Sequence, residues 1–243
     1  MNKILIMSDI HGNLSALNQV LCVEDINDID GIILLGDLID YGPRSNEVVE
    51  VIKNIPKNKI LVNIWGNHEK AIIDSDNSRF SSERGRKSAH YTQKNMRPET
   101  IEYINKNMES AGVKEFYLQD KKCLAVHGSL ADIYWKSITH TESNIEYSDY
   151  DIVFSGHSHQ PHFYEHFYEA DNVEYRNKKK TMFINPGAVG QPRNHNRNAQ
   201  YVILETDTWS IQMRSVEYAV EEECALFSQE VDSFYMERLK KGI

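Results

Sequence analysis

The apolar positions in the first third of the chain alternate between short runs and stretches with helical spacing. Apolar runs lie at residues 3–7, 32–35 and 60–65, and the helical stretches between them open near Asn13 and Ser45. A short continuous apolar run indicates a buried strand, whereas apolar residues three or four positions apart indicate an amphipathic helix. The pattern therefore predicts a βαβαβ start, in which helices connect parallel strands.

The rest of the chain has a different pattern. Residues from about 74 to 112 are polar and helix-prone, which predicts a helical insertion that either forms a lid or only elaborates the fold. A final helical pattern runs from about residue 220 to 239. Between these two regions, strand signals cover residues 123–126, 152–154, 162–168, 181–184, 201–205 and 211–216. Because two packed sheets are more economical than one very wide sheet, we expect two sheets flanked by helices.

Length and composition narrow the class of protein. The 243 residues suit a single domain over residues 1–243, and a hydrophobic content of 40% is enough for a buried core. The apolar runs are far shorter than the roughly 20 residues that cross a bilayer. The N-terminus also lacks the apolar segment of a signal peptide, so we expect a cytoplasmic protein without membrane partners. A net charge of −9 disfavours binding along nucleic-acid backbones, so a phosphate ligand needs a local positive site.

Candidate chemistry is concentrated in five short segments. Each places a side chain that can bind a metal in a turn directly after an apolar run. The segments are Ser8-Asp9-Ile10-His11-Gly12, Gly36-Asp37, Gly66-Asn67-His68-Glu69, His127-Gly128 and Gly156-His157-Ser158-His159. Side chains two positions apart on an extended segment point the same way, so each Asp-x-His or His-x-His pair can bind one region of space. Imidazole nitrogens combined with carboxylate and amide oxygens suit manganese, iron, zinc or cobalt.

The ordered set of these segments resembles the calcineurin-like metallophosphoesterase superfamily. The loop from Asn185 to Arg193 is similar to a loop of the small prokaryotic phosphodiesterases within that superfamily. The resemblance implies a four-layer αββα sandwich, with two packed mixed β-sheets flanked by helices, and a site for two divalent metal ions. It implies one ion bound by Asp9, His11, Asp37 and His159, and a second bound by Asp37, Asn67, His127 and His157. Asp37 would then bridge the two ions.

The resemblance also implies a mechanism. A metal-activated hydroxide would attack phosphorus in line, and His68, outside the metal shell, would protonate the leaving oxygen with Glu69 as its orienting partner. Arg193 is the candidate for binding a substrate phosphate, because a guanidinium pairs with phosphate oxygens in a fork; the alternative is an ordinary surface arginine. Further candidates for substrate contact, close in sequence to the metal-binding segments, are Tyr41, Arg44 and Tyr134.

The predicted activity is hydrolysis of phosphodiester or phosphoanhydride bonds in a small phosphorylated substrate. Nucleotides and dinucleoside polyphosphates are the candidate substrates. A phosphomonoesterase or protein phosphatase is the alternative, because the same two-metal site serves all of these reactions. An exonuclease is disfavoured by the acidic charge, and a non-catalytic scaffold by the presence of every implied ligand and of His68. The final helix is either a dimerisation face or an outer packing layer, so the sequence leaves undecided whether the protein forms a homo-oligomer.

Overall fold

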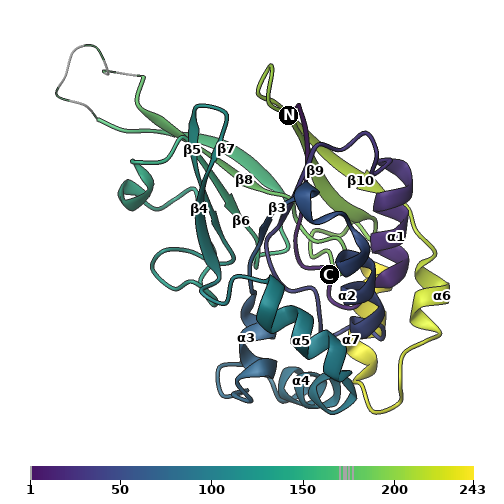
Figure 1. Cartoon of the computed structure of the whole chain (residues 1–243). Coiled ribbons are helices and arrows are strands. Elements are labelled where there is room, and N and C mark those ends of the chain that lie inside the picture. The colour runs from purple at the N-terminus through teal and green to yellow at the C-terminus, as the bar shows by residue number, and fades with distance from the viewer. Residues whose placement is uncertain (1, 170, 172–173, 175, 177) are drawn as a thin grey trace.

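Two five-stranded sheets pack face to face in the computed structural model, which describes residues 2–169, 171, 174, 176 and 178–243 (Figure 1). The first sheet contains β1 (Lys3–Met7), β2 (Gly31–Leu34), β3 (Ile60–Asn63), β9 (Ala199–Glu205) and β10 (Ser210–Val216). Its order is β10-β9-β1-β2-β3. The strands β1, β2 and β3 are parallel, as the βαβαβ prediction requires, and β9 and β10 are added antiparallel to their neighbours.

The second sheet comes from the later part of the chain. It contains β4 (Val113–Leu118), β5 (Lys121–Val126), β6 (Ile152–Ser155), β7 (His162–Phe167) and β8 (Lys180–Asn185). Its order is β4-β5-β6-β8-β7, with β5, β6 and β8 parallel and with antiparallel strands at both edges. Two mixed sheets flanked by helices are the predicted fold class, and the structure confirms it.

The two faces of strand β1 are buried in two different hydrophobic cores. Ile4 and Ile6 belong to the core between the sheets, where they join Phe154 from β6. Leu5 and Met7 belong to the core between the first sheet and its helices. Successive side chains of a strand point to opposite faces, so a strand buried on both faces reads as a continuous apolar run. That is why this run indicated a buried strand.

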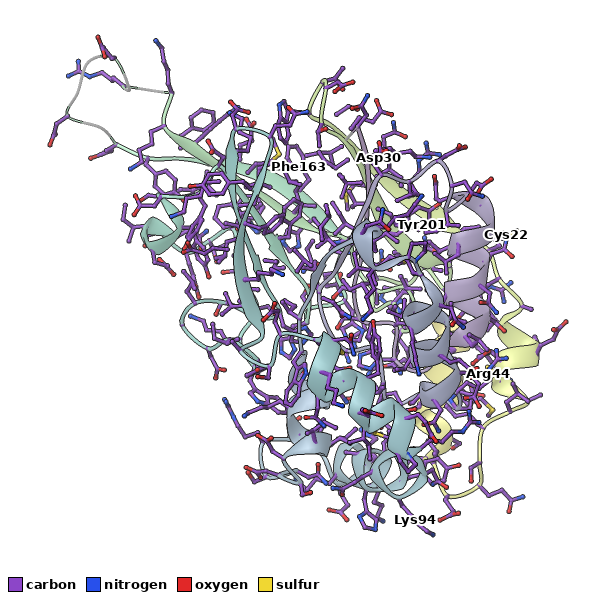
Figure 2. All side chains as sticks on the ribbon, in the orientation of Figure 1. Cys22, Asp30, Arg44, Lys94, Phe163 and Tyr201 are labelled. Atoms are coloured by element: carbon purple, nitrogen blue, oxygen red, sulfur yellow. The ribbon has the colours of Figure 1, made fainter. Side chains whose placement is uncertain are left out.

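Seven α-helices and two short 3₁₀ helices complete the described part of the chain. They are α1 (Leu14–Val23), α2 (Ser45–Asn54), η1 (Lys57–Lys59), α3 (Asn67–Ile73), α4 (Glu83–Asn95), α5 (Pro98–Asn107), η2 (Ile145–Tyr147), α6 (Val220–Cys224) and α7 (Ser233–Lys241). Helix α1 begins where the sequence predicted, because the Asn13 side chain accepts a hydrogen bond from the Ala16 N–H at 3.1 Å. Figure 1 shows α1 and α2 beside the first sheet, and Figure 2 shows exposed Cys22 on the outer side of α1.

The C-terminal helical pattern is interrupted, so the expectation of one helix over residues 220–239 is wrong. Helix α6 ends at Cys224, and α7 begins only after Asp232, whose side chain accepts a hydrogen bond from the Phe234 N–H at 2.9 Å. A new N-cap starts a new helix. Strand β4 was also missed, because its VKEFYL sequence neither alternates strictly nor forms a long apolar run: Lys114 and Glu115 are adjacent polar residues in this edge strand.

The segment predicted as an insertion, about 74–112, contains α4 and α5. Helix α4 directs the buried hydroxyls of Ser88 and Thr92 towards the carboxylate of Asp40, in the loop after β2. The segment therefore contributes side chains next to the loops that carry the candidate chemistry; its action as a lid stays a prediction. Within the described residues, every helix is too short or too polar to span a membrane.

Candidate metal centre

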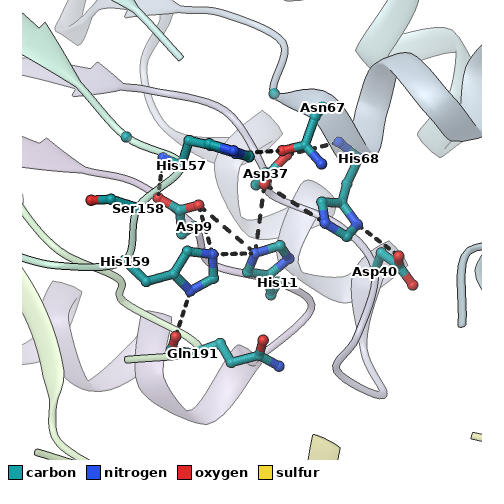
Figure 3. A network of polar contacts seen from close by, with 12 residues as sticks. Asp9, His11, Asp37, Asp40, Asn67, His68, His157, Ser158, His159 and Gln191 are labelled. Carbon is teal, nitrogen blue, oxygen red and sulfur yellow. Dashed lines mark hydrogen bonds and ion pairs between the residues drawn. The ribbon is translucent and has the colours of Figure 1, made fainter. Parts of the chain in front are cut away.

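The five candidate segments converge at one edge of the two packed sheets. Asp9 and His11 follow β1, Asp37 follows β2, and Asn67 opens α3 just after β3. His127 directly follows β5, and the His157–His159 segment follows β6 in the same way. The carboxyl ends of parallel strands meet at one sheet edge, where open α/β sheets bind their ligands. Figure 3 shows the side chains of these loops directed at one another.

The backbone of these loops is turned tightly. Five of the metal-capable residues have positive φ angles, although none is glycine: Asp9 (53°), His11 (47°), Asp37 (53°), His157 (63°) and His159 (57°). The expectation that Asp-x-His and His-x-His project from extended segments is therefore wrong. A left-handed conformation costs a non-glycine residue about 1–3 kcal/mol, and such strain clusters at functional sites. The tight turns, and not strand alternation, aim these side chains at a common centre.

A first group of donors comprises Asp9, His11, Asp37 and His159, whose ligand atoms all lie within 4.8 Å of one another. The His159 Nε2 atom lies 3.1 Å from Asp9 Oδ1 and 3.2 Å from His11 Nε2. His11 Nε2 in turn lies 3.6 Å from Asp37 Oδ2. All four side chains are almost fully buried. Two imidazole nitrogens and two carboxylates therefore face one small volume, which is a donor set for a divalent cation.

A second group shares Asp37 with the first. Asp37, His127 and His157 offer ligand atoms within 4.8 Å of one another, and His127 Nε2 lies 3.4 Å from Asp37 Oδ2. The Asn67 Oδ1 atom joins them, at 3.0 Å from His127 Nε2 and 2.9 Å from His157 Nδ1. Asp37 thus lies between the two groups. All seven residues predicted as metal ligands are brought together.

Two carboxylate oxygens test whether this cluster fits a cation. Asp9 Oδ1 and Asp37 Oδ2 are buried and have no hydrogen-bond partner among the described residues. Burial alone would raise the pKa of both carboxyls, but the charge of His159 beside Asp9 and that of His127 beside Asp37 outweigh it and lower both pKa values. Buried ionised oxygens without partners are costly. A divalent cation would satisfy both oxygens, so the residues fit a metal.

The histidines are oriented for the same purpose. Three of them place Nδ1 beside a backbone carbonyl oxygen, which accepts the Nδ1–H and leaves Nε2 free to face the centre. The pairs are His11 with Ile39 at 3.2 Å, His127 with Leu35 at 2.7 Å and His159 with Gln191 at 2.5 Å. Burial lowers the pKa of His127, but the Asp37 charge outweighs it and raises this pKa to about 9.

Glu69 has a different role from the one predicted. Its carboxylate accepts hydrogen bonds from the backbone N–H groups of Asp37, Leu38 and Gly66, each at 2.8 Å. It therefore holds the turn that carries Asp37 and does not orient His68. Burial, with the nearby Asp37 charge, raises the pKa of Glu69 to about 7. The sequence suggested the wrong partner because adjacency along a helix does not make side chains face each other.

The partner of His68 is Asp40, which sequence reasoning missed. His68 Nδ1 lies 2.7 Å from Asp40 Oδ2. The other oxygen, Asp40 Oδ1, accepts hydrogen bonds from Ser88 at 2.7 Å and Thr92 at 2.8 Å. Burial lowers the pKa of His68, but the charges of Asp37 and Asp40 outweigh this and raise it. The available signal was a second carboxylate three residues after Asp37 in the same loop.

The residues predicted to contact substrate have different surroundings in the structure. The Tyr41 ring packs on His68, with centroids 4.3 Å apart, and on His11 at 4.7 Å, so it borders the centre. Arg44 instead forms an ion pair with the buried carboxylate of Glu223 in α6. Tyr134 donates its hydroxyl hydrogen to the Ser110 carbonyl. Arg193 is half-buried in the loop between β8 and β9.

A buried Asp/His cluster that could hold a divalent metal ion therefore lies at one edge of two packed mixed sheets. The chain belongs to the calcineurin-like phosphoesterase superfamily, whose domain model matches residues 2–209. A metallophosphoesterase from Sphaerobacter thermophilus is similar in structure, with a TM-score of 0.76 and 28% identity over 100% of this chain and 99% of that one.

Two archaeal proteins are also similar. An uncharacterised protein of Methanocaldococcus jannaschii is 28% identical over 226 residues, which cover 90% of this chain and 89% of that protein. A hypothetical protein from Pyrococcus horikoshii has a TM-score of 0.80 over 100% of this chain and 99% of that one. Its identity is 18%, so this likeness shows the fold alone.

Proposed function

We propose that this phosphoesterase hydrolyses phosphodiester or phosphoanhydride bonds in small phosphorylated substrates, at a centre that holds two divalent ions. The observation that supports two ions is a pair of donor groups that share Asp37. The first ion would be held by Asp9, His11, Asp37 and His159, and the second by Asp37, Asn67, His127 and His157. When bound, such ions lower the pKa of water and neutralise charge on phosphoryl oxygens.

The chain's own contribution to bond cleavage is a proton held by His68. Asp40 accepts the Nδ1–H and fixes the imidazole plane, while the raised pKa favours the protonated ring. The opposite nitrogen, Nε2, lies 3.9 Å from Asp37 Oδ2, so it faces the donor cluster. A protonated Nε2 in that position would donate to the leaving oxygen as the phosphorus bond breaks. Asp40 is accordingly a positioning residue for this step.

The proposed substrates are nucleotides and dinucleoside polyphosphates, and Arg193 is the proposed phosphate contact. Its charge contributes, after burial, to lowering the pKa of His159, so the guanidinium lies close to the donor cluster. Its Nε atom is buried and has no hydrogen-bond partner within the described residues. A guanidinium with an unused donor beside a metal centre suits a phosphate oxygen.

A chelator-controlled substrate panel tests the proposal. Bis-aryl phosphate, mono-aryl phosphate, a nucleoside triphosphate and a dinucleoside polyphosphate are each incubated with manganese, magnesium or cobalt. We expect metal-dependent release from the diester or the anhydrides, abolished by chelator and by Asp37→Ala but not by Asp149→Ala, which changes an exposed aspartate. Faster release from mono-aryl phosphate would identify a phosphomonoesterase instead. Absence of metal-dependent release from all four would overturn the proposal.

A further inference from the structure

The C-terminal helix α7 packs on Tyr41, which borders the candidate metal centre, although α7 lies beyond residues 2–209 matched by the family. Tyr235 of α7 stacks on Tyr41, with ring centroids 4.4 Å apart and an interplanar angle of 20°. Tyr41 in turn packs on His11 and His68. Tyr41 thus links α7 to two imidazoles of the centre.

One of these residues is Arg238. Its Nη1 atom donates a hydrogen bond to Gln191 Oε1 at 3.3 Å, while its Nε is buried and has no partner in the described part of the chain. The backbone carbonyl of Gln191 accepts from His159 Nδ1, so Arg238 is one residue away from the donor cluster. Arg193 lies two positions after Gln191 in the same loop and also has a buried, unpaired Nε. Two guanidiniums with unused donors thus belong to one loop and its neighbour: Arg193 lies in the loop, and Arg238 of α7 bonds to it.

A third guanidinium approaches from α4. The Arg84 guanidinium carbon lies 4.0 Å from the centroid of the Phe234 ring, and that of Arg238 lies 4.8 Å from the same centroid. Phe234 therefore holds two cations on its ring by cation–π contact. Figure 1 shows α7 beside α4, which agrees with these distances. The helical segment 74–112 and the C-terminal helix thus meet through these side chains.

Three guanidiniums, those of Arg84, Arg193 and Arg238, define the arginine cluster. Among the described residues, none of the three forms an ion pair with Asp or Glu within 4.0 Å. By contrast, Arg44 pairs with Glu223 and Arg97 pairs with Glu47. Burial, and then the charge of Arg193, lowers the pKa of Arg238 to about 10. Like charges that are gathered together repel one another, and a bound anion would relieve this repulsion.

We propose that Arg84, Arg193 and Arg238 form an anion-binding subsite that holds a second phosphate group, while the scissile phosphate lies at the metal centre. This rests on the proposed function and specifies its substrate class: molecules with two or more phosphate groups, such as nucleoside polyphosphates, rather than simple diesters. Guanidinium groups bind phosphate oxygens through paired, charge-assisted hydrogen bonds, so three of them suit one phosphate.

Direct binding tests the subsite without depending on hydrolysis. Inorganic pyrophosphate is titrated calorimetrically into the full chain in the absence of divalent ions. We expect Arg238→Gln and Arg193→Gln each to weaken binding by about tenfold or more, as the loss of charge-assisted hydrogen bonds implies. Arg97→Gln, which removes an exposed arginine paired with Glu47, is the matched control and leaves binding unchanged. Equal pyrophosphate affinity in Arg238→Gln and in the unchanged protein would overturn the inference.

Kinetics then separate the subsite from the metal centre. Arg238→Gln is expected to raise the KM for a nucleoside triphosphate by about tenfold while changing the KM for bis-aryl phosphate less than about twofold. Equal effects on both substrates would contradict a second-phosphate role. If Arg238→Gln does not fold, the KM values for the two substrates are compared in Arg84→Gln, which changes an exposed residue. Arg238→Lys tests whether a positive charge alone partly restores the KM for the nucleoside triphosphate. Wild-type protein that binds pyrophosphate but hydrolyses nothing would refute the proposed function and leave the subsite supported.

Discussion

The carboxylates at the two sides of the site differ in how their oxygens are satisfied. Asp40 is completely buried, and both of its oxygens accept hydrogen bonds, from His68 on one side and from Ser88 and Thr92 on the other. Asp9 and Asp37 are equally buried, yet each keeps one oxygen with no partner among the described residues. Burial is therefore the same, and only hydrogen-bond satisfaction distinguishes them.

This difference indicates which buried carboxylates have their hydrogen bonds satisfied by the chain itself and which do not. The Asp40 side is a finished network that fixes one imidazole, because satisfied buried polar groups are rigid. On the Asp37 side, the carboxylate oxygens without a hydrogen-bond partner lie beside histidine Nε2 atoms. The Nδ1 atoms of these histidines are already bonded to backbone carbonyls. A cation would satisfy these oxygens. The comparison predicts that the two sides respond differently to mutation and to metal.

The largest effect is expected from Asp37→Ala. This change removes a donor from both proposed ion sites, so turnover of the best panel substrate should fall by about 10⁴-fold or more. Metal content, measured by elemental analysis after gel filtration, should fall from two ions per chain. Retention of two ions would show that Asp37 does not bridge. Asp149→Ala serves as the control for an aspartate change outside the site.

His68→Ala should keep the bound metal and lose turnover by about 10²–10⁴-fold, the usual contribution of a positioned general acid. The loss should be large for a substrate with a poor leaving group, such as a nucleoside, and small for nitrophenolate, which departs without a proton. Exposed His90→Ala is the matched control. A uniform loss across leaving groups would argue against proton donation by His68.

Removal of metal should lower stability. Manganese at about 100 times its Kd would stabilise the native chain by about 2.7 kcal/mol, which is a rise in Tm of roughly 5–10 °C for a chain of this size. The rise should be absent in Asp37→Asn. Differential scanning calorimetry with chelator and with added manganese measures it, and an unchanged Tm in the native protein would contradict a cation at the carboxylate oxygens without a hydrogen-bond partner.

The smallest expected effect is that of Asp40→Asn. It removes the charge that holds the His68 ring while leaving the donor cluster intact, so turnover should fall by about tenfold with poor leaving groups. The decisive readout is a double-mutant cycle. Asp40→Asn should have no further effect in the His68→Ala background, because a positioning residue acts only through its partner. Additive losses would mean that Asp40 acts independently of His68.

Much of the fold followed from local pattern. The apolar runs predicted β1, β2 and β3 to within a few residues, because a strand segment buried on both faces must be apolar, as residues 4–7 of β1 are. The pattern failed at edge strand β4, where the adjacent polar residues Lys114 and Glu115 shorten the apolar run. It also failed at the C-terminal helices, where Asp232 caps a new helix inside a continuous helical pattern. Edges and caps depend on single residues and neighbours, so periodicity does not detect them.

For the site, the sequence alone determined the candidate donors, because each follows a strand in order and parallel strands end at a common edge. Only the tertiary structure decided how these residues meet: left-handed turns aim them, Glu69 holds the Asp37 loop, and Asp40 orients His68. It also brought Arg84 and Arg238, 154 positions apart in the chain, onto one phenylalanine ring. The sequence shows which residues can donate to a metal ion. Contacts between side chains that are distant in the sequence form only when packing brings their helices, strands and loops together.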